Sequence, residues 1–101
     1  MLFRSLGDWT GQAGDPAAAR DLLAGLLPMR ERVLGPEHPD TLATRADLAR
    51  WTGEAGDPAA ARDQSAALVA VRERVSGPEH PETLTARHSL AYWTAQATEA
   101  I

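Results

Sequence analysis

A near-exact internal repeat is the feature that most limits the folds open to this chain. The segment Trp9–Asp21 returns almost unchanged as Trp51–Asp63, 42 residues later. At the same offset Gly35–Leu42 returns as Gly77–Leu84, and a third copy begins at Tyr92 before it diverges. A fixed period in this range is typical of stacked-repeat proteins, in which each unit buries its apolar face only against its neighbours. The sequence therefore predicts a row of similar units.

Composition narrows the class of protein further. A chain of 101 residues suffices for one small domain, and its many alanines favour closely packed helices. It has no cysteine, which excludes disulfides and suits a reducing compartment. The net charge of −4 comes from acidic and basic residues that are mixed along the chain, so no basic face points to nucleic acid. No apolar run reaches membrane-spanning length, and we expect a cytoplasmic protein that binds neither nucleic acid nor membranes.

The first turn signal in each repeat is Gly-Asp-Pro, at residues 14–16 and 56–58. Glycine can end a helix in a left-handed conformation, and aspartate can cap the helix that follows. Proline is tolerated at the first helical position because its missing N–H would be unpaired there. The turn is therefore tight, and the helices that it joins should be antiparallel.

The second turn signal is Gly-Pro-Glu-His-Pro, at residues 35–39 and 77–81. Gly35 should end one helix and Pro39 should open the next, with Asp40 near its positive end. No segment alternates with period two, so we expect an all-α protein. The predicted helices are Leu2–Ala13, Pro16–Leu34, Pro39–Ala55, Pro58–Ser76 and Pro81–Ala97, five in all. Pro28 predicts a kink in the second. Apolar positions at helical spacing are Leu42, Ala46, Ala49, Ala61, Leu68, Val71 and Val75.

These features resemble the tetratricopeptide repeat (TPR) family. That family places a leucine and a small residue before the turn and an alanine after it. The residues at these places are Leu6, Gly7 and Ala19 in the first unit and Leu48, Ala49 and Ala61 in the second. The 42-residue period and the segment Arg30–Asp40 are closer still to the longer repeats of kinesin light chains and of arrays in bacterial signalling ATPases. The resemblance implies a TPR-like α-solenoid of antiparallel helix pairs with about 2.5 repeats.

A single domain, residues 1–101, should hold these units. Repeat 1 spans about residues 1–38 with an incomplete first helix, repeat 2 about 39–80, and the first helix of repeat 3 about 81–101. The open ends should expose apolar side chains, namely Leu2, Phe3 and Leu6 at one end and Leu84, Leu90 and Trp93 at the other. Such surfaces favour a homo-oligomer formed by end-to-end stacking or helix exchange.

The resemblance also implies a non-enzymatic scaffold that binds a protein or peptide in a concave groove lined by the first helices of successive units. The groove positions carried over are Arg4, Asp8, Gln12, Ala46, Asp47, Arg50, Glu54, His88, Tyr92 and Gln96. They differ between copies, as ligand-reading positions would, although neutral drift on an exposed face would look the same. The alternative is a structural segment of a longer repeat array that mainly self-associates through its open ends.

The tryptophans Trp9, Trp51 and Trp93 occupy one equivalent place. Packing between repeats explains them more simply than an aromatic ladder that grips a ligand.

His38 and His80 lie beside carboxylates, but a structural zinc site needs about four converging ligands and the repeat offset holds the two histidines apart. We expect them to satisfy helix ends, and we expect no metal and no cofactor. The arginines at 30, 32, 72 and 74 should pair with acidic residues or be solvated. Neither a nucleophile constellation nor a phosphate-binding glycine loop indicates an enzyme.

Overall fold

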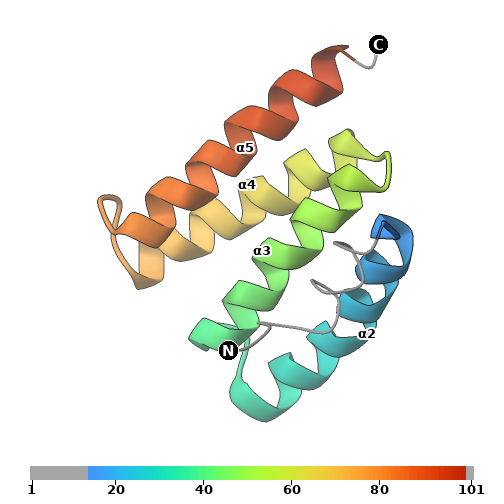
Figure 1. Cartoon of the computed structure of the whole chain (residues 1–101). Coiled ribbons are helices and arrows are strands. Elements are labelled where there is room, and N and C mark those ends of the chain that lie inside the picture. The colour runs from blue at the N-terminus through green and yellow to red at the C-terminus, as the bar shows by residue number, and fades with distance from the viewer. Residues whose placement is uncertain (1–13, 100–101) are drawn as a thin grey trace.

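A computed structural model describes residues 14–99, and these form four α-helices with no strand among them (Figure 1). The helices are α2 (Pro16–Leu34), α3 (Pro39–Glu54), α4 (Pro58–Val75) and α5 (Pro81–Glu99). Their ends lie within two residues of the predicted ones, and the all-α prediction is confirmed. The predicted first helix, Leu2–Ala13, lies outside the described residues.

The Gly-Asp-Pro turns have the capping geometry that the sequence predicts. The Asp15 carboxylate accepts a hydrogen bond from the backbone N–H of Ala18 at 3.0 Å, and Asp57 accepts one from Ala60 at 3.1 Å. A proline follows each aspartate at the start of the helix. Gly56 has φ of 106°, a region that favours glycine, so the chain can reverse direction there. The helices on either side of each turn are thus placed by local chemistry.

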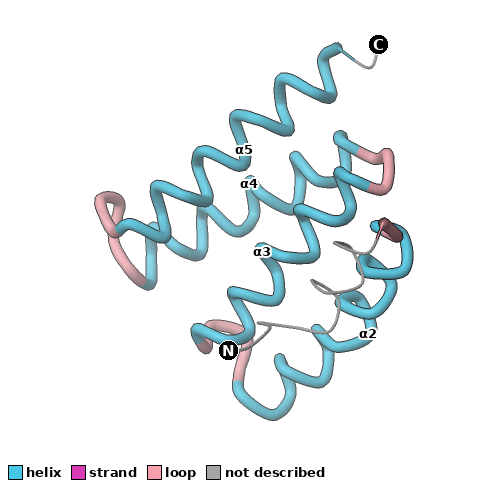
Figure 2. The backbone as a smooth tube through the Cα atoms, in the orientation of Figure 1, coloured by secondary structure: helices cyan, strands magenta, loops and turns pink. Residues whose placement is uncertain are grey.

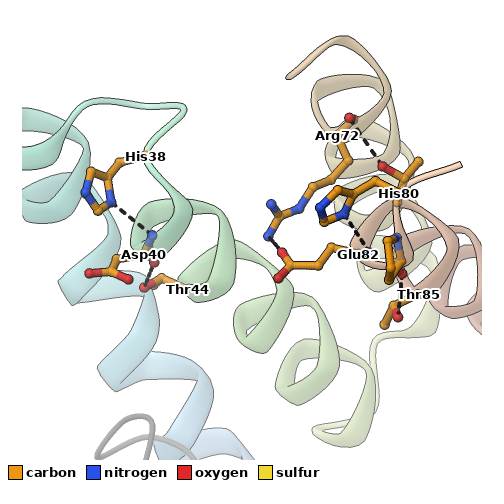
Figure 3. A network of polar contacts seen from close by, with 9 residues as sticks. His38, Asp40, Thr44, Arg72, His80, Glu82 and Thr85 are labelled. Atoms are coloured by element: carbon orange, nitrogen blue, oxygen red, sulfur yellow. Dashed lines mark hydrogen bonds and ion pairs between the residues drawn. The ribbon is translucent and has the colours of Figure 1, made fainter. Parts of the chain in front are cut away.

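Histidine side chains cap the other two helices (Figure 3). His38 Nδ1 accepts a hydrogen bond from the backbone N–H of Asp40 at 3.0 Å, at the start of α3. His80 Nδ1 accepts one from the backbone N–H of Glu82 at 3.1 Å, at the start of α5. Each cap satisfies one of the N–H groups that a helix start leaves without a partner. The prediction that these histidines satisfy helix ends is confirmed.

The helices pack in chain order, each against the next (Figures 1 and 2). α4 contacts α3 on one side and α5 on the other, whereas α3 and α5 contact one another little. Two apolar clusters fill the interfaces. One contains Ala19, Leu23 and Trp51, with Leu48 against them, and the other contains Leu42, Leu68, Val69 and Ala86, with Val71 and Leu90 against them. Each cluster joins residues from successive units, as stacked repeats require.

Two of the predicted apolar positions are not in the core. Val75 is 45% exposed because it lies in the last turn of α4, and Ala46 is exposed on α3. The other five positions are buried or partly buried. α2 continues through Pro28 without a break, so the kink stays a prediction.

Trp93 corrects one expectation about the open end of the stack. We expected it to be exposed, but its side chain is buried, with 7% exposure, because the ring lies directly on Gly53 of α3. Trp51 is buried as well, so the packing interpretation is confirmed for both tryptophans, while Trp9 lies outside the described residues. Leu84 is 50% exposed, as expected of this end, and Leu90 is half-buried.

Candidate binding groove

A groove runs between α3 and α5, with α4 as its floor. Its volume is about 270 Å³. Because α3 and α5 contact one another little, the surface of α4 between them is left open to this side. The lining residues are Ala43, Ala46, Ala49 and Arg50 from α3, Ser65, Leu68 and Arg72 from α4, and Glu82, Thr85, Ala86 and Ser89 from α5. We call this feature the α3–α5 groove.

Short side chains explain why the groove stays open. On α3, Ala43, Ala46 and Arg50 are spaced by three and then four residues, which places them along one face of the helix. The alanines on this face end at the methyl group, so they leave space above the floor. Leu68 supplies an apolar surface at the floor. The groove therefore presents an apolar base between two walls, as recognition sites commonly do.

One end of the groove carries an ion pair between a nearly buried arginine and an exposed glutamate (Figure 3). Arg72 is only 7% exposed, and its Nη2 lies 2.7 Å from Glu82 Oε1. The backbone carbonyl of Arg72 accepts a hydrogen bond from the Thr83 hydroxyl at 3.3 Å, which holds the end of α4 to the start of α5. The equivalent pair in the preceding unit, Arg30 with Asp40, is 3.9 Å apart. The two units thus share the pairing, but Arg72 and Glu82 hold it more closely.

Three other arginines, Arg50, Arg74 and Arg87, also make side-chain contacts. Arg50 lies with its guanidinium carbon 4.3 Å from the centre of the Trp51 ring. Arg74 pairs with Glu37 of the preceding unit, and Arg87 of α5 pairs with Glu73 of α4 at 2.5 Å. The expectation that Arg30, Arg72 and Arg74 pair with acidic residues is therefore confirmed. Exposed pairs of this kind contribute about 0–1 kcal/mol each.

The seven predicted groove residues that lie within the described part of the chain fall into three groups. Ala46 and Arg50 line the groove. His88 and Tyr92 are exposed on α5, three and seven residues after the lining residue Thr85, so they continue the same helical face beyond the groove. Asp47 is buried, Glu54 is exposed near the end of α3, and Gln96 is half-buried on α5, and none of these three lines the groove.

Arg4, Asp8 and Gln12 lie outside the described residues. The assignment of all ten residues to ligand contact stays a prediction.

The sequence did not lead us to the residues that line the floor of the groove or its α5 wall. We considered only the first helix of each unit and so overlooked Ser65 and Arg72 on α4. Ser65 is 2% exposed, and its hydroxyl has no hydrogen-bond partner among residues 14–99. The signal for the α5 wall was available, because Thr85 lies three residues before the predicted His88 and Ser89 lies three residues before the predicted Tyr92. No sequence pattern signals a buried hydroxyl without a partner.

Other kinds of site find no support within residues 14–99. In this range no group of three or more histidine, aspartate or glutamate side chains could hold a metal ion. None of the four helices combines the length and the apolar character that crossing a bilayer requires.

A second and more open hollow lies between α2 and α4 over α3. It is lined by Leu27, Glu31, Arg45, Leu48, Asp63, Gln64 and Ala67.

Stacked helix pairs with a groove between their first helices define a helical-repeat protein of the TPR type. The sequence model of the tetratricopeptide repeat family matches residues 1–68, and the chain belongs to this family. The crystal structure of the nearly identical TPR-like repeats of a kinesin light chain-like protein from Podosopora anserina is similar to it. The TM-score is 0.86 at 27% identity, and the match covers 95% of this chain and 46% of that one.

A single-residue variant of the Podosopora anserina protein gives the same TM-score and identity, with 45% of its chain covered. The chain thus spans about half the length of these structures. No curated protein sequence matches it significantly. The resemblance to kinesin light chain-like TPR repeats is confirmed.

Proposed function

We propose that the protein is a non-enzymatic interaction scaffold that binds a peptide or helix of a protein partner in the α3–α5 groove. The observation that carries the proposal is the groove itself, in which apolar Leu68 lies on the floor between two walls made mostly of small side chains, in a chain of the TPR family. Proteins use such concave sites for recognition. Arg50 and Tyr92, exposed at its edges, are residue types that commonly anchor partners.

The groove suits side chains of a bound segment better than a whole small molecule. Its volume of about 270 Å³ lies below the usual range for small-molecule pockets, about 300–1,000 Å³. A bound segment would place apolar side chains over Leu68 and between the alanines. The Arg72–Glu82 pair would meet its polar groups at one end. The ligand is therefore a segment with apolar side chains on one face and polar groups at one end.

Blocking the groove tests the proposal directly. Peptides are first selected on the full chain from a displayed random library, and their binding is measured by fluorescence anisotropy. Ala46→Trp puts a large ring into the groove and should abolish binding. Ala70→Trp is the matched control, because Ala70 is also an exposed alanine but lies on α4 outside the groove. If the selected peptides bind the Ala46→Trp chain with unchanged affinity, the groove is not the site.

The groove edges need a separate test. Arg50→Ala combined with Tyr92→Ala removes one large side chain from α3 and one from α5 while the floor remains. A bound segment that reaches both edges should then bind at least tenfold more weakly, since each truncated anchor commonly costs more than 1 kcal/mol. Unchanged affinity would remove these two residues from the proposed site.

Self-association through the open ends is the second candidate, and one observation favours it. Leu84 is half-exposed although Leu42, at the equivalent place in the preceding unit, is fully buried. A face that is covered in one unit is thus open in the next. Sedimentation over a range of concentrations tests this candidate, which requires the mass to rise above that of the monomer.

A further inference from the structure

Trp93 of α5 packs directly on Gly53 of α3. A Cβ atom placed on Gly53 would lie less than 3.0 Å from three atoms of the Trp93 ring, Cη2, Cζ3 and Cζ2. Carbon atoms pack favourably at about 3.5–4.0 Å, so an alanine there would force the ring to move. Gly53 has no positive φ, and so it is not needed for an unusual backbone conformation. It is needed for the space that the ring occupies.

This glycine belongs to the repeat pattern, and the pattern changes in the third copy. The tripeptide Trp-Thr-Gly occurs at residues 9–11 and 51–53, but residues 93–95 are Trp-Thr-Ala. A glycine inside a helix weakens it, so its return at the same place indicates a packing role. Ala95 stands where the first two copies have glycine, and it is exposed on α5.

We propose that a tryptophan seated on a glycine sets the register between successive units, and that Ala95 ends this series. A further unit placed on α5 as α5 is placed on α3 would lay its tryptophan on residue 95. The methyl group of Ala95 would occupy the space of that ring, just as a Cβ on Gly53 would occupy the space of Trp93. The open face of α5 therefore does not accept a unit that carries tryptophan at this position.

The alanine at position 95 limits how a second copy of the chain can join at α5, whatever the groove binds. Leu84 leaves an apolar surface at this end of the stack. The glycine on which the tryptophan of a further unit would pack is replaced there by Ala95. A second copy of this chain carries tryptophan in every unit, so it cannot continue the stack in register on α5. Exchange of a terminal helix does not need a tryptophan to pack on residue 95, so it stays open as a route by which two copies could join.

An extended chain tests the proposal. Residues 1–95 are joined directly to a second copy of residues 54–101, which adds one Gly-Asp-Pro turn, one copy of α4 and one copy of α5 in the 42-residue period. The chain is made with alanine at position 95 and with Ala95→Gly. Urea unfolding is followed by circular dichroism, and acrylamide quenching reports the exposure of the added tryptophan.

The proposal expects Ala95→Gly to raise the unfolding midpoint of the extended chain and to protect its added tryptophan from quenching. In the original chain of 101 residues, the same substitution should lower the midpoint, because there it only weakens an exposed stretch of helix. The sign of the effect therefore reverses between the two chains. A lower midpoint in both chains, or an added tryptophan equally protected with alanine at position 95, would overturn the proposal.

Discussion

Gly53→Ala tests how much the packing of Trp93 on Gly53 contributes to the free energy of unfolding. In a helix the substitution alone should stabilise by about 1 kcal/mol, since alanine is the better helix former. Against this, three atoms of the Trp93 ring lie less than 3.0 Å from the new Cβ position, and overpacking of a core costs about 1–3 kcal/mol. Complete expulsion of the ring would expose about 150–250 Å², or about 4–6 kcal/mol as an upper limit.

We expect a net loss between these limits, about 2 kcal/mol. For a domain of this size such a loss lowers the melting temperature by about 8–16 °C. Thermal and urea unfolding followed by circular dichroism measure it. Trp93→Phe provides the matched background, because the shorter ring lacks the outer edge that meets Gly53. In that background Gly53→Ala should stabilise instead. Equal destabilisation in both backgrounds would refute the steric argument.

Three further tests probe other contacts of the structure, each by urea unfolding of the full chain. Ser65→Ala should stabilise by about 1 kcal/mol, because it removes a buried hydroxyl without a hydrogen-bond partner; a destabilised variant would mean that this hydroxyl is satisfied in solution. His80→Ala should cost about 0.5–2 kcal/mol through loss of the α5 cap, while His80→Asn should retain most of the stability. Equal losses for these two variants would assign the effect to packing of the ring. Glu82→Gln should cost about 1.5–3 kcal/mol, because it removes the charged partner of the nearly buried Arg72. Glu37→Gln, which removes the partner of the exposed Arg74, should cost at most about 1 kcal/mol, and a similar loss for both would contradict the role given to burial.

Local chemistry explains why the helices could be predicted from the sequence. Asp57 and Pro58 start a helix through interactions within one turn, and Gly56 ends the preceding segment through its own backbone freedom. The repeat offset then identifies the same boundaries twice. Burial could not be obtained in this way, because it depends on the facing helix. Trp93 was expected to be exposed, yet its ring lies on Gly53 of the preceding unit.

The same distinction applies to the candidate groove. Ala46 and Arg50 were found by analogy with the first helices of TPR units, where position along one helix is sufficient. Ser65 and Arg72 come from the helix behind, and they reach the groove only because α3 and α5 stand apart over α4. Such residues depend on the spacing between helices, which periodicity in a single sequence does not report.

The scarcity of direct contact between α3 and α5 has a mechanical consequence. Each of these helices is held mainly by its own interface with α4, so small rotations at the two interfaces alter the distance between the groove walls away from the contact of Trp93 with Gly53. The α3–α5 groove can therefore widen or narrow to fit a bound ligand. A ligand that draws both walls inward would restrict the motion of α3, α4 and α5 together. Its effect would therefore extend to the far end of each helix.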